Sequence, residues 1–203
     1  MKSRLNGLTQ IAASFFLIFT LSPCSADAEI YVEPMISYLT GSVDYQIKDS
    51  VPTIGGTKGE NSVSGFGFGA GLGYKSKGGL RVGADVHQFN LETKSDSSTT
   101  KSSEMIIFGV VGYEFQKDFT GYFGGGSFTS TSEGDPQTKI TGVALKLGVM
   151  HRMHRWLLVS VEGVLYTPDE STTGTAAPVK IADVYSKFNS TAVVANLRIP
   201  FEF

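Results

Sequence analysis

The sequence of 203 residues contains a single cysteine, Cys24, which lies close to the amino terminus. One thiol forms no internal disulfide and supplies too few ligands for a cysteine-based metal site. If the chain is cleaved after Ala28, the remaining residues contain no cysteine, so a thiol nucleophile is excluded as well. We therefore expect a fold without disulfides or cysteine-bound metal ions, and no other metal site or cofactor is predicted.

Long apolar runs and an excess of charge of one sign are also missing. After residue 28, no apolar stretch reaches the ~20 residues that a membrane-spanning helix needs. The 17 basic and 19 acidic residues give a net charge of −2, which provides no basic face for nucleic acid. The 24 glycines and the modest charge suit a domain of short strands and turns.

The amino terminus has the organisation of a secretory signal peptide. Lys2 and Arg4 form a positive region, and Ile11–Leu21 is an apolar run of the appropriate length. Ala26–Ala28 then supplies small residues before a cleavage site. We interpret residues 1–28 as a signal peptide.

The mature protein is then predicted to begin at Glu29 and to form one domain over residues 29–203. The alternative is a lipoprotein cleavage box, Leu21–Cys24, that ends on a lipidated Cys24. Pro23 fits that box poorly, so we favour cleavage after Ala28.

The end of the chain, from Thr191 to Phe203, alternates between apolar side chains and a mostly polar or small set. The apolar positions are Val193, Ala195, Leu197, Ile199, Phe201 and Phe203. Because successive side chains of a strand point to opposite faces, the segment predicts a strand with one apolar face. It resembles the carboxy-terminal sorting signal of bacterial outer-membrane β-barrels. The resemblance implies that the assembly machinery reads Leu197, Ile199, Phe201 and Phe203.

Eight segments after residue 28 are predicted as strands: 30–40, 63–74, 80–91, 104–115, 119–129, 140–150, 156–166 and 186–203. The connections after every second segment are short, whereas the other four are long and polar: Val43–Asn61, Glu92–Ser103, Ser130–Lys139 and Thr167–Tyr185. An even number of strands with short turns at one end and long loops at the other is typical of an outer-membrane barrel. Lipid offers no hydrogen-bond partner, so such a sheet has to close on itself. The predicted fold class is therefore all-β, an eight-stranded antiparallel transmembrane β-barrel.

This pattern resembles the small OmpA/OmpX-type barrels, including the opacity-protein-like surface barrels. The resemblance covers residues 29–203 as a pattern and a topology, not as a run of matching residues. It implies a location in the bacterial outer membrane and contact with outer-membrane lipids and the outer-membrane assembly machinery.

The strand alternation directs several charged side chains into the barrel lumen. The expected lumen network consists of Arg81, Asp85, Glu114, Lys146, Glu162 and Arg198. Glu33, Glu104 and Glu202 are expected near the mouths of the barrel. Charges in a narrow interior have to pair or be solvated, so we interpret this network as a stabilising plug of ion pairs. A gated pore or proton path is the alternative.

Three local features accompany this interpretation. The alternation within 80–91 shifts near Gln88, which predicts a β-bulge. Pro34 and Pro200 are expected to lie close together at the periplasmic end of the seam between the first and last strands. Inward-facing glycines of 63–74 are expected to leave room for Trp156, Tyr166 or Arg198, or alternatively for an acyl chain; they are Gly65, Gly67, Gly69, Gly71 and Gly73.

The function favoured by these features is non-catalytic: envelope integrity, or surface interaction with a host or phage ligand through the outer loops. The longest loops, Val43–Asn61 and Thr167–Tyr185, flank the barrel seam and are predicted to form a joint surface. A lipid-modifying enzyme, of the lipid A acyltransferase or deacylase type, is an alternative that needs a histidine near a serine or a carboxylate. His87 with Asp85 is the candidate pair, because His151 and His154 fall in a periplasmic turn.

Overall fold

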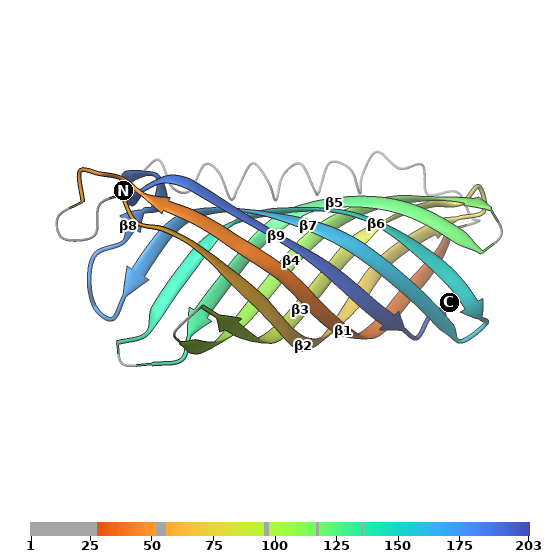
Figure 1. The fold of residues 1–203 in the computed structure, drawn as a ribbon. Helices are drawn as coiled ribbons and strands as arrows, with labels where there is room; N and C mark the ends of the chain where they lie inside the picture. Colours follow the sequence, from red (N-terminus) through yellow and green to blue (C-terminus); the bar gives the residue numbers. More distant parts are fainter. Residues whose placement is uncertain (1–27, 52–55, 96–97, 117, 135) are drawn as a thin grey trace.

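A computed structural model describes residues 28–51, 56–95, 98–116, 118–134 and 136–203. Nearly all of the expected signal peptide, together with Cys24, lies outside these residues. Eight long strands form one antiparallel ring (Figure 1). They are β1 (Ala28–Ile47), β2 (Lys58–Ser76), β3 (Leu80–Lys94), β4 (Thr99–Gln116), β5 (Phe119–Ser132), β6 (Thr138–His154), β7 (Leu157–Thr173) and β9 (Tyr185–Arg198). Among the residues described, no helix has the length and apolar character needed to cross a membrane.

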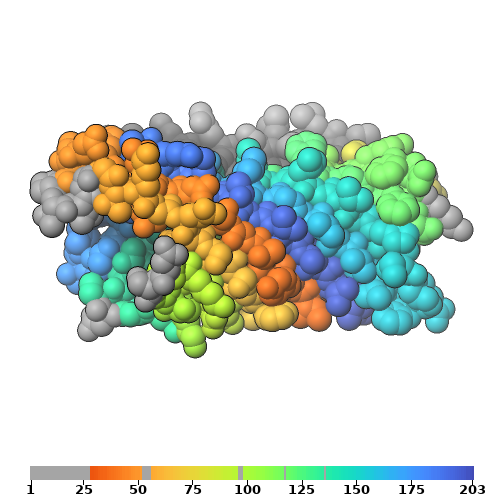
Figure 2. All heavy atoms as spheres, viewed as in Figure 1, coloured from red at the N-terminus to blue at the C-terminus, as the bar shows by residue number. Residues whose placement is uncertain are grey.

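The ring closes where β9 pairs with β1 on one side and with β7 on the other. In Figure 2 the orange atoms of β1 accordingly lie beside the dark blue atoms of the chain's last long strand. The short strand β10 (Phe201–Glu202) continues the pairing with β1 after a break at residues 199–200. Closure leaves no long edge strand, which satisfies the backbone hydrogen bonds of a sheet surrounded by lipid.

The outward face of the ring carries a belt of exposed apolar side chains. Phe66, Phe68, Leu72 and Tyr74 on β2 are 43–72% exposed, and Val143, Leu145, Leu147 and Val149 on β6 are 50–71% exposed. On β2 the belt extends from Phe66 to Tyr74, which matches the roughly 9–11 residues that a strand needs to cross a bilayer. Exposure of an apolar surface of this extent to water is unfavourable for a monomer, whereas lipid acyl chains cover it.

The strands are longer than the sequence indicated, and the outer connections are correspondingly shorter. β1 contains 20 residues and remains paired with β2 as far as Gln46 opposite Lys58. Both ends of the predicted loop Val43–Asn61, about half of its length, are therefore strand, and the loops predicted at 92–103, 130–139 and 167–185 shrink in the same way. Polar side chains such as Ser62 and Ser64 do not interrupt a strand, because the cross-strand ladder continues through them. The barrel wall thus rises beyond its apolar belt.

The connections at the outer end of the seam are structured and joined. Between β7 and β9 lie the short strand β8 (Val179–Lys180) and the single-turn helix α2 (Ile181–Val184), whose Ile181 is buried. The backbone N–H of Lys48 donates a hydrogen bond to the carbonyl of Val184 at 2.9 Å. The two seam connections therefore meet, as the sequence predicted.

Of the local predictions, the proximity of Pro34 and Pro200 at the seam is confirmed, although Pro34 lies within the β1–β2 ladder, opposite Ala70. The N–H of Ile199 donates to the carbonyl of Pro34 at 2.9 Å, and Pro200 falls in the break between β9 and β10. A strand break is where a residue without an N–H is tolerated.

Two other local predictions are wrong. The register of β3 is continuous through Gln88 on both sides, so there is no bulge at that position. What changes is the lumen itself, from charged at Asp85 to apolar at Phe89, while the side-chain parity stays the same. Trp156 precedes β7 in a turn and is 54% exposed, so its side chain does not enter the lumen.

Candidate functional site in the barrel lumen

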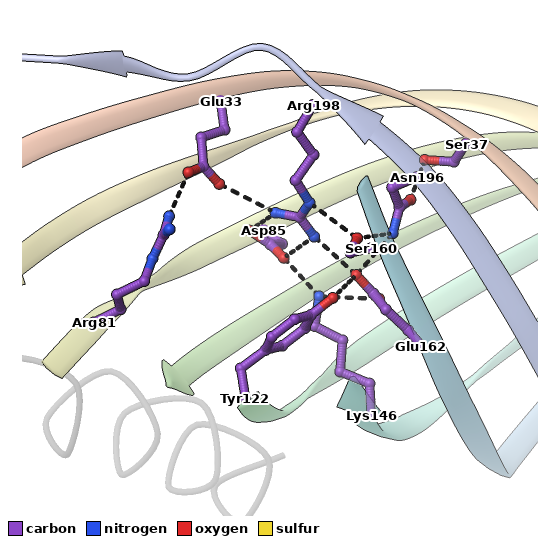
Figure 3. A network of polar contacts seen from close by, with 10 residues as sticks. All are labelled: Glu33, Ser37, Arg81, Asp85, Tyr122, Lys146, Ser160, Glu162, Asn196 and Arg198. Atoms are coloured by element: carbon purple, nitrogen blue, oxygen red, sulfur yellow. Dashed lines mark hydrogen bonds and ion pairs between the residues drawn. The ribbon is translucent and has the colours of Figure 1, made fainter. Parts of the chain in front are cut away.

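The inward side chains divide the lumen into two halves. The half nearer the carboxy-terminal end of the chain holds an ion cluster, made of the six charged residues Glu33, Arg81, Asp85, Lys146, Glu162 and Arg198 (Figure 3). Each is at most 6% exposed. The half nearer the outer end is filled by apolar side chains and contains a cavity.

Arg198 of β9 is the centre of the ion cluster. Its Nη2 lies 3.1 Å from Oδ2 of Asp85 and 2.8 Å from Oε1 of Glu162. Its Nη1 lies 3.5 Å from Oε2 of Glu33. A guanidinium has donors on several nitrogens in a rigid plane, so it contacts three carboxylates from three different strands at once.

Lys146 of β6 joins two of the same carboxylates. Its Nζ lies 2.6 Å from Oδ2 of Asp85 and 3.2 Å from Oε2 of Glu162. The ammonium also lies 4.7 Å from the ring centroid of Phe108, where a cation–π attraction adds to the ion pairs.

Arg81 of β3 completes the balance by pairing with Glu33, and its guanidinium lies 4.1 Å above the ring centroid of Tyr31. Three cations then compensate three carboxylates. A balanced set avoids the large cost of an isolated charge in a lumen without bulk water.

Neutral side chains occupy hydrogen-bonding positions that remain around Glu162. Tyr122 and Asn196 both donate to its Oε1, at 2.7 and 2.8 Å. The Asn196 amide also donates to Ser160 at 2.9 Å and accepts from Ser37 at 2.5 Å. This chain of hydrogen bonds links β1, β5, β7 and β9 across the lumen (Figure 3).

The inward glycine of β2 at position 71 makes room for the cluster. A Cβ atom at Gly71 would lie 2.7 Å from Oδ1 of Asp85 and 3.3 Å from Nη1 of Arg198. The glycine row of 63–74 therefore accommodates Arg198, one of the residues considered from the sequence. It also accommodates the ring of Phe89, which a Cβ at Gly67 would meet at 2.5 Å.

One member of the predicted network needs correction. Glu114 does not reach the cluster; its Oε2 pairs with Nζ of Lys75 at 2.8 Å at the rim, where both side chains are partly exposed. Glu33, expected near a mouth, takes its place in the cluster and is fully buried. Glu33 could have been recognised from its parity, because it shares the inward face of β1 with Tyr31, Met35 and Ser37.

The other two acidic residues expected near the mouths lie at opposite ends. Glu202 pairs with Arg152 at 2.6 Å on the same rim as Glu114. Glu104 is 6% exposed on the outer side of the lumen, where it accepts a hydrogen bond from Tyr166 at 3.0 Å.

His87 lies where the two halves meet, stacked on Phe89 with ring centroids 5.6 Å apart. Neither ring nitrogen has a hydrogen-bond partner among the described residues. Asp85 accepts hydrogen bonds from Lys146 and Arg198, so the candidate His87–Asp85 catalytic pair is not formed.

Asp85, His87 and Glu162 place one possible metal-ligating atom each within 4.8 Å of the others. Both carboxylates already hold Lys146 and Arg198, however. A divalent ion would have to displace these cations, so the set is a poor cation site.

The apolar half closes the lumen above the cluster. Leu39, Phe89, Ile106, Phe108, Val164 and Val194 are at most 2% exposed and pack into one cluster. Beyond them, among the described residues, a cavity of about 370 Å³ lies towards the outer end, whereas a void beside the ion cluster measures about 20 Å³ and one between Arg81 and the opposite rim about 10 Å³. Voids of that size hold no more than a water molecule, so they leave no room for a larger solute beside the ion cluster.

The expected assembly-signal residues lie together on one face. Leu197, Ile199, Phe201 and Phe203 are 46–78% exposed on the lipid-facing side of the seam. The N–H of Phe203 and the carbonyl of Ile30 are hydrogen-bonded at 2.9 Å, which holds the end of the chain on β1.

Comparison with solved structures gives the same architecture. Neisserial surface protein A superimposes with a TM-score of 0.51 and 15% identity, over 85% of this chain and 97% of that one. Ail of Yersinia pestis, solved with the heparin analogue sucrose octasulfate, gives a TM-score of 0.50 and 11% identity, over 86% and 99%. This chain has the small, eight-stranded outer-membrane β-barrel fold of the OmpA/OmpX type.

No known family profile matches the sequence, and no curated protein matches it. The likeness in fold agrees with the closed ring and with the apolar belt on the outside of the barrel. Both features agree with the location in the bacterial outer membrane that the sequence predicted.

Proposed function

We propose that this outer-membrane barrel is non-catalytic and acts at the cell surface through its outer end. The observation that carries the proposal is the height of the wall. On β2 the apolar belt begins at Phe66, yet the strand continues outward through Ser64 and Ser62 to Lys58 and stays paired with β1. Spanning the bilayer does not require these residues, and a rigid scaffold that projects from a membrane is a suitable place for binding.

The projecting outer surface carries charges of both signs. The sign of the charge alternates along the outward faces: Lys58 is followed by Glu60 on β2, and Glu92 by Lys94 on β3. A polyanion such as a sulfated polysaccharide needs clustered cations, which this pattern does not favour. The heparin analogue bound to Ail therefore does not transfer to this protein, and hydrogen bonding to a protein or glycan surface suits the alternation better.

The joined seam connections are the best candidates for the contact surface. The hydrogen bond between Lys48 and Val184 links them, and Ile181 anchors α2 by burying its side chain. A surface anchored in this way loses less conformational entropy on binding than two independent loops would lose.

Two features support a non-catalytic role. His87 makes no hydrogen bond to Asp85, so this pair does not form the oriented general base that such an enzyme would need. The three carboxylates of the ion cluster are engaged in ion pairs, which suits a structural plug. Envelope integrity, through the rigid plugged barrel, is the second candidate function.

The test separates these two roles. One variant replaces residues 49–56 with Asn-Gly and another replaces residues 175–183 with Asn-Gly, and heat-modifiable electrophoretic migration confirms folding. We expect cells with either variant to lose adhesion to host cells or phage adsorption while retaining detergent resistance. Arg155→Ala, in the turn at the opposite end, is the control and should change neither. Loss of detergent resistance with unchanged surface binding would favour envelope integrity.

Export and assembly form a further part of the proposal. We propose cleavage after Ala28 and recognition of Leu197, Ile199, Phe201 and Phe203 by the assembly machinery. Amino-terminal sequencing should give Glu29, and a lipidated Cys24 would contradict this cleavage. Deleting Phe203 should slow the appearance of folded barrel, and an unchanged yield would contradict the sorting role.

A further inference from the structure

The outer half of the lumen contains a cavity that none of the roles above uses. It measures about 370 Å³ and is bounded by β1, β2, β3, β4 and other strands of the ring where they rise beyond the apolar belt. Its walls include the apolar side chains of Leu39, Val63, Leu91, Phe128 and Ile140. This volume lies at the small end of the range of pockets that bind organic molecules.

One carboxyl group faces this apolar space. Glu104 of β4 lines the cavity, is 6% exposed and accepts a hydrogen bond from the Tyr166 hydroxyl at 3.0 Å. The cavity lining contains no lysine, arginine or histidine among the described residues. A buried carboxylate without a cation is costly, so the site favours a ligand that supplies positive charge.

The carboxylates of the ion cluster differ from Glu104 in their partners. Glu33, Asp85 and Glu162 are also buried carboxylates, and each has at least one cationic partner within 3.2 Å. Glu104 has a phenol hydrogen bond instead, from Tyr166. Among the described residues, the carboxylates of the ion cluster therefore have cationic partners, whereas Glu104 in the outer half has none.

The entrance of the cavity is aromatic. Tyr185 makes edge-to-face contacts with Tyr45 and Phe188, at centroid distances of 5.9 and 5.4 Å, and all three line the cavity. Aromatic faces attract cations and pack against flat or apolar groups. The entrance therefore suits the same class of ligand as the part of the cavity beside Glu104.

We propose that this cavity binds a small amphiphilic amine from outside the cell. The ammonium group donates a hydrogen bond to Glu104, and the apolar body contacts Leu39, Leu91 and Ile140. The aromatic residues at the entrance cover the outer end of the ligand. This inference does not depend on the proposed surface interaction, because it uses the interior of the wall and not its outer face.

The test uses the full barrel in lipid nanodiscs and three probes of nearly equal shape: 2-phenylethylamine, 2-phenylethanol and phenylacetate. Methyl NMR signals of Leu39, Leu91 and Ile140 report binding, and empty nanodiscs measure partition into lipid. We expect the amine to bind roughly tenfold more tightly than the alcohol, since a hydrogen bond to a charged group is the stronger one. The anion should not bind.

Substitutions then locate the site. Glu104→Gln should lower the affinity for the amine to that for the alcohol and leave the affinity for the alcohol unchanged. Glu60→Gln, on the exposed outer face of β2, is the matched control and should leave the amine preference intact. Equal binding of the three probes by the parent protein, or an amine preference that survives Glu104→Gln, would overturn the proposal. If Glu104→Gln fails to fold, the ratio of amine to alcohol affinity in the parent decides the question.

Discussion

The two halves of the lumen are built on the same inward faces of the same strands, yet they are stabilised in different ways. On β3, Arg81 and Asp85 belong to the ion cluster, and Phe89, only four residues after Asp85, belongs to the apolar half. The void beside the cluster measures about 20 Å³, whereas the cavity in the outer half measures about 370 Å³. The half with the ion cluster is thus tightly filled, whereas the outer half retains open space beyond its packed apolar side chains.

This contrast predicts where the barrel is sensitive to substitution. A charge removed from the cluster leaves its partners buried and unbalanced, which is expensive. A small change at a rim or at the boundary between the halves costs less, because water or apolar neighbours replace the lost contacts. Four substitutions test the contrast, each by urea unfolding of the barrel in lipid vesicles.

The largest effect is expected for Arg198→Ala. Its guanidinium contacts Glu33, Asp85 and Glu162, so its loss should lower the free energy of unfolding by about 3–5 kcal/mol. The control is Arg152→Ala, which removes the partly exposed pair with Glu202 and should cost less than about 1 kcal/mol. Equal costs for the two variants would mean that the ion cluster contributes no special stability.

Gly71→Ala comes next, at about 1–3 kcal/mol of destabilisation. The new Cβ would lie 2.7 Å from Oδ1 of Asp85 and force the cluster to shift. Gly163→Ala on β7 is the matched control, because the nearest atom to its Cβ is the carbonyl oxygen of Leu147 at 4.0 Å. If both variants unfold at the parental midpoint, the cluster is more plastic than its contacts indicate.

His87→Leu should change the free energy of unfolding by no more than about 1 kcal/mol, in either direction. It loses the stacking on Phe89 but also removes two buried nitrogens that lack partners among the described residues. A loss comparable to that of Arg198→Ala would place His87 functionally inside the ion cluster and would move the boundary between the halves.

The smallest effect is expected for Glu114→Gln, at about 0.5 kcal/mol. Its partner Lys75 is at the rim and both side chains are partly exposed, so water screens the pair. A cost above about 2 kcal/mol would instead be typical of a buried network member, the role that the sequence had assigned to Glu114.

The sequence predicted the ring, the facing of most of its strands and most of the ion cluster. The alternation of Phe66–Tyr74 and of Val143–Val149 followed directly from the period of a strand, and both faces lie where that period places them. Arg81, Asp85, Lys146, Glu162 and Arg198 were found because each lies on an inward parity.

Three features could not be read in this way. Glu114 and Glu33 occupy similar inward positions along their strands, and only the register and tilt of the closed ring decide which of them reaches Arg198. The outer ends of the strands were missed because serine and threonine look like loop residues until a partner strand pairs with them. The cavity beside Glu104 depends on how side chains from several strands fill a common space.

The sequence by itself determined a closed, lipid-facing barrel, because periodicity and the need to satisfy every backbone hydrogen bond in lipid allow little else. Tertiary structure alone decided which charges meet, how far the wall projects and where space remains. Those outcomes depend on distances between residues far apart in the chain, such as Glu33 and Arg198, and such distances are set only when the ring closes.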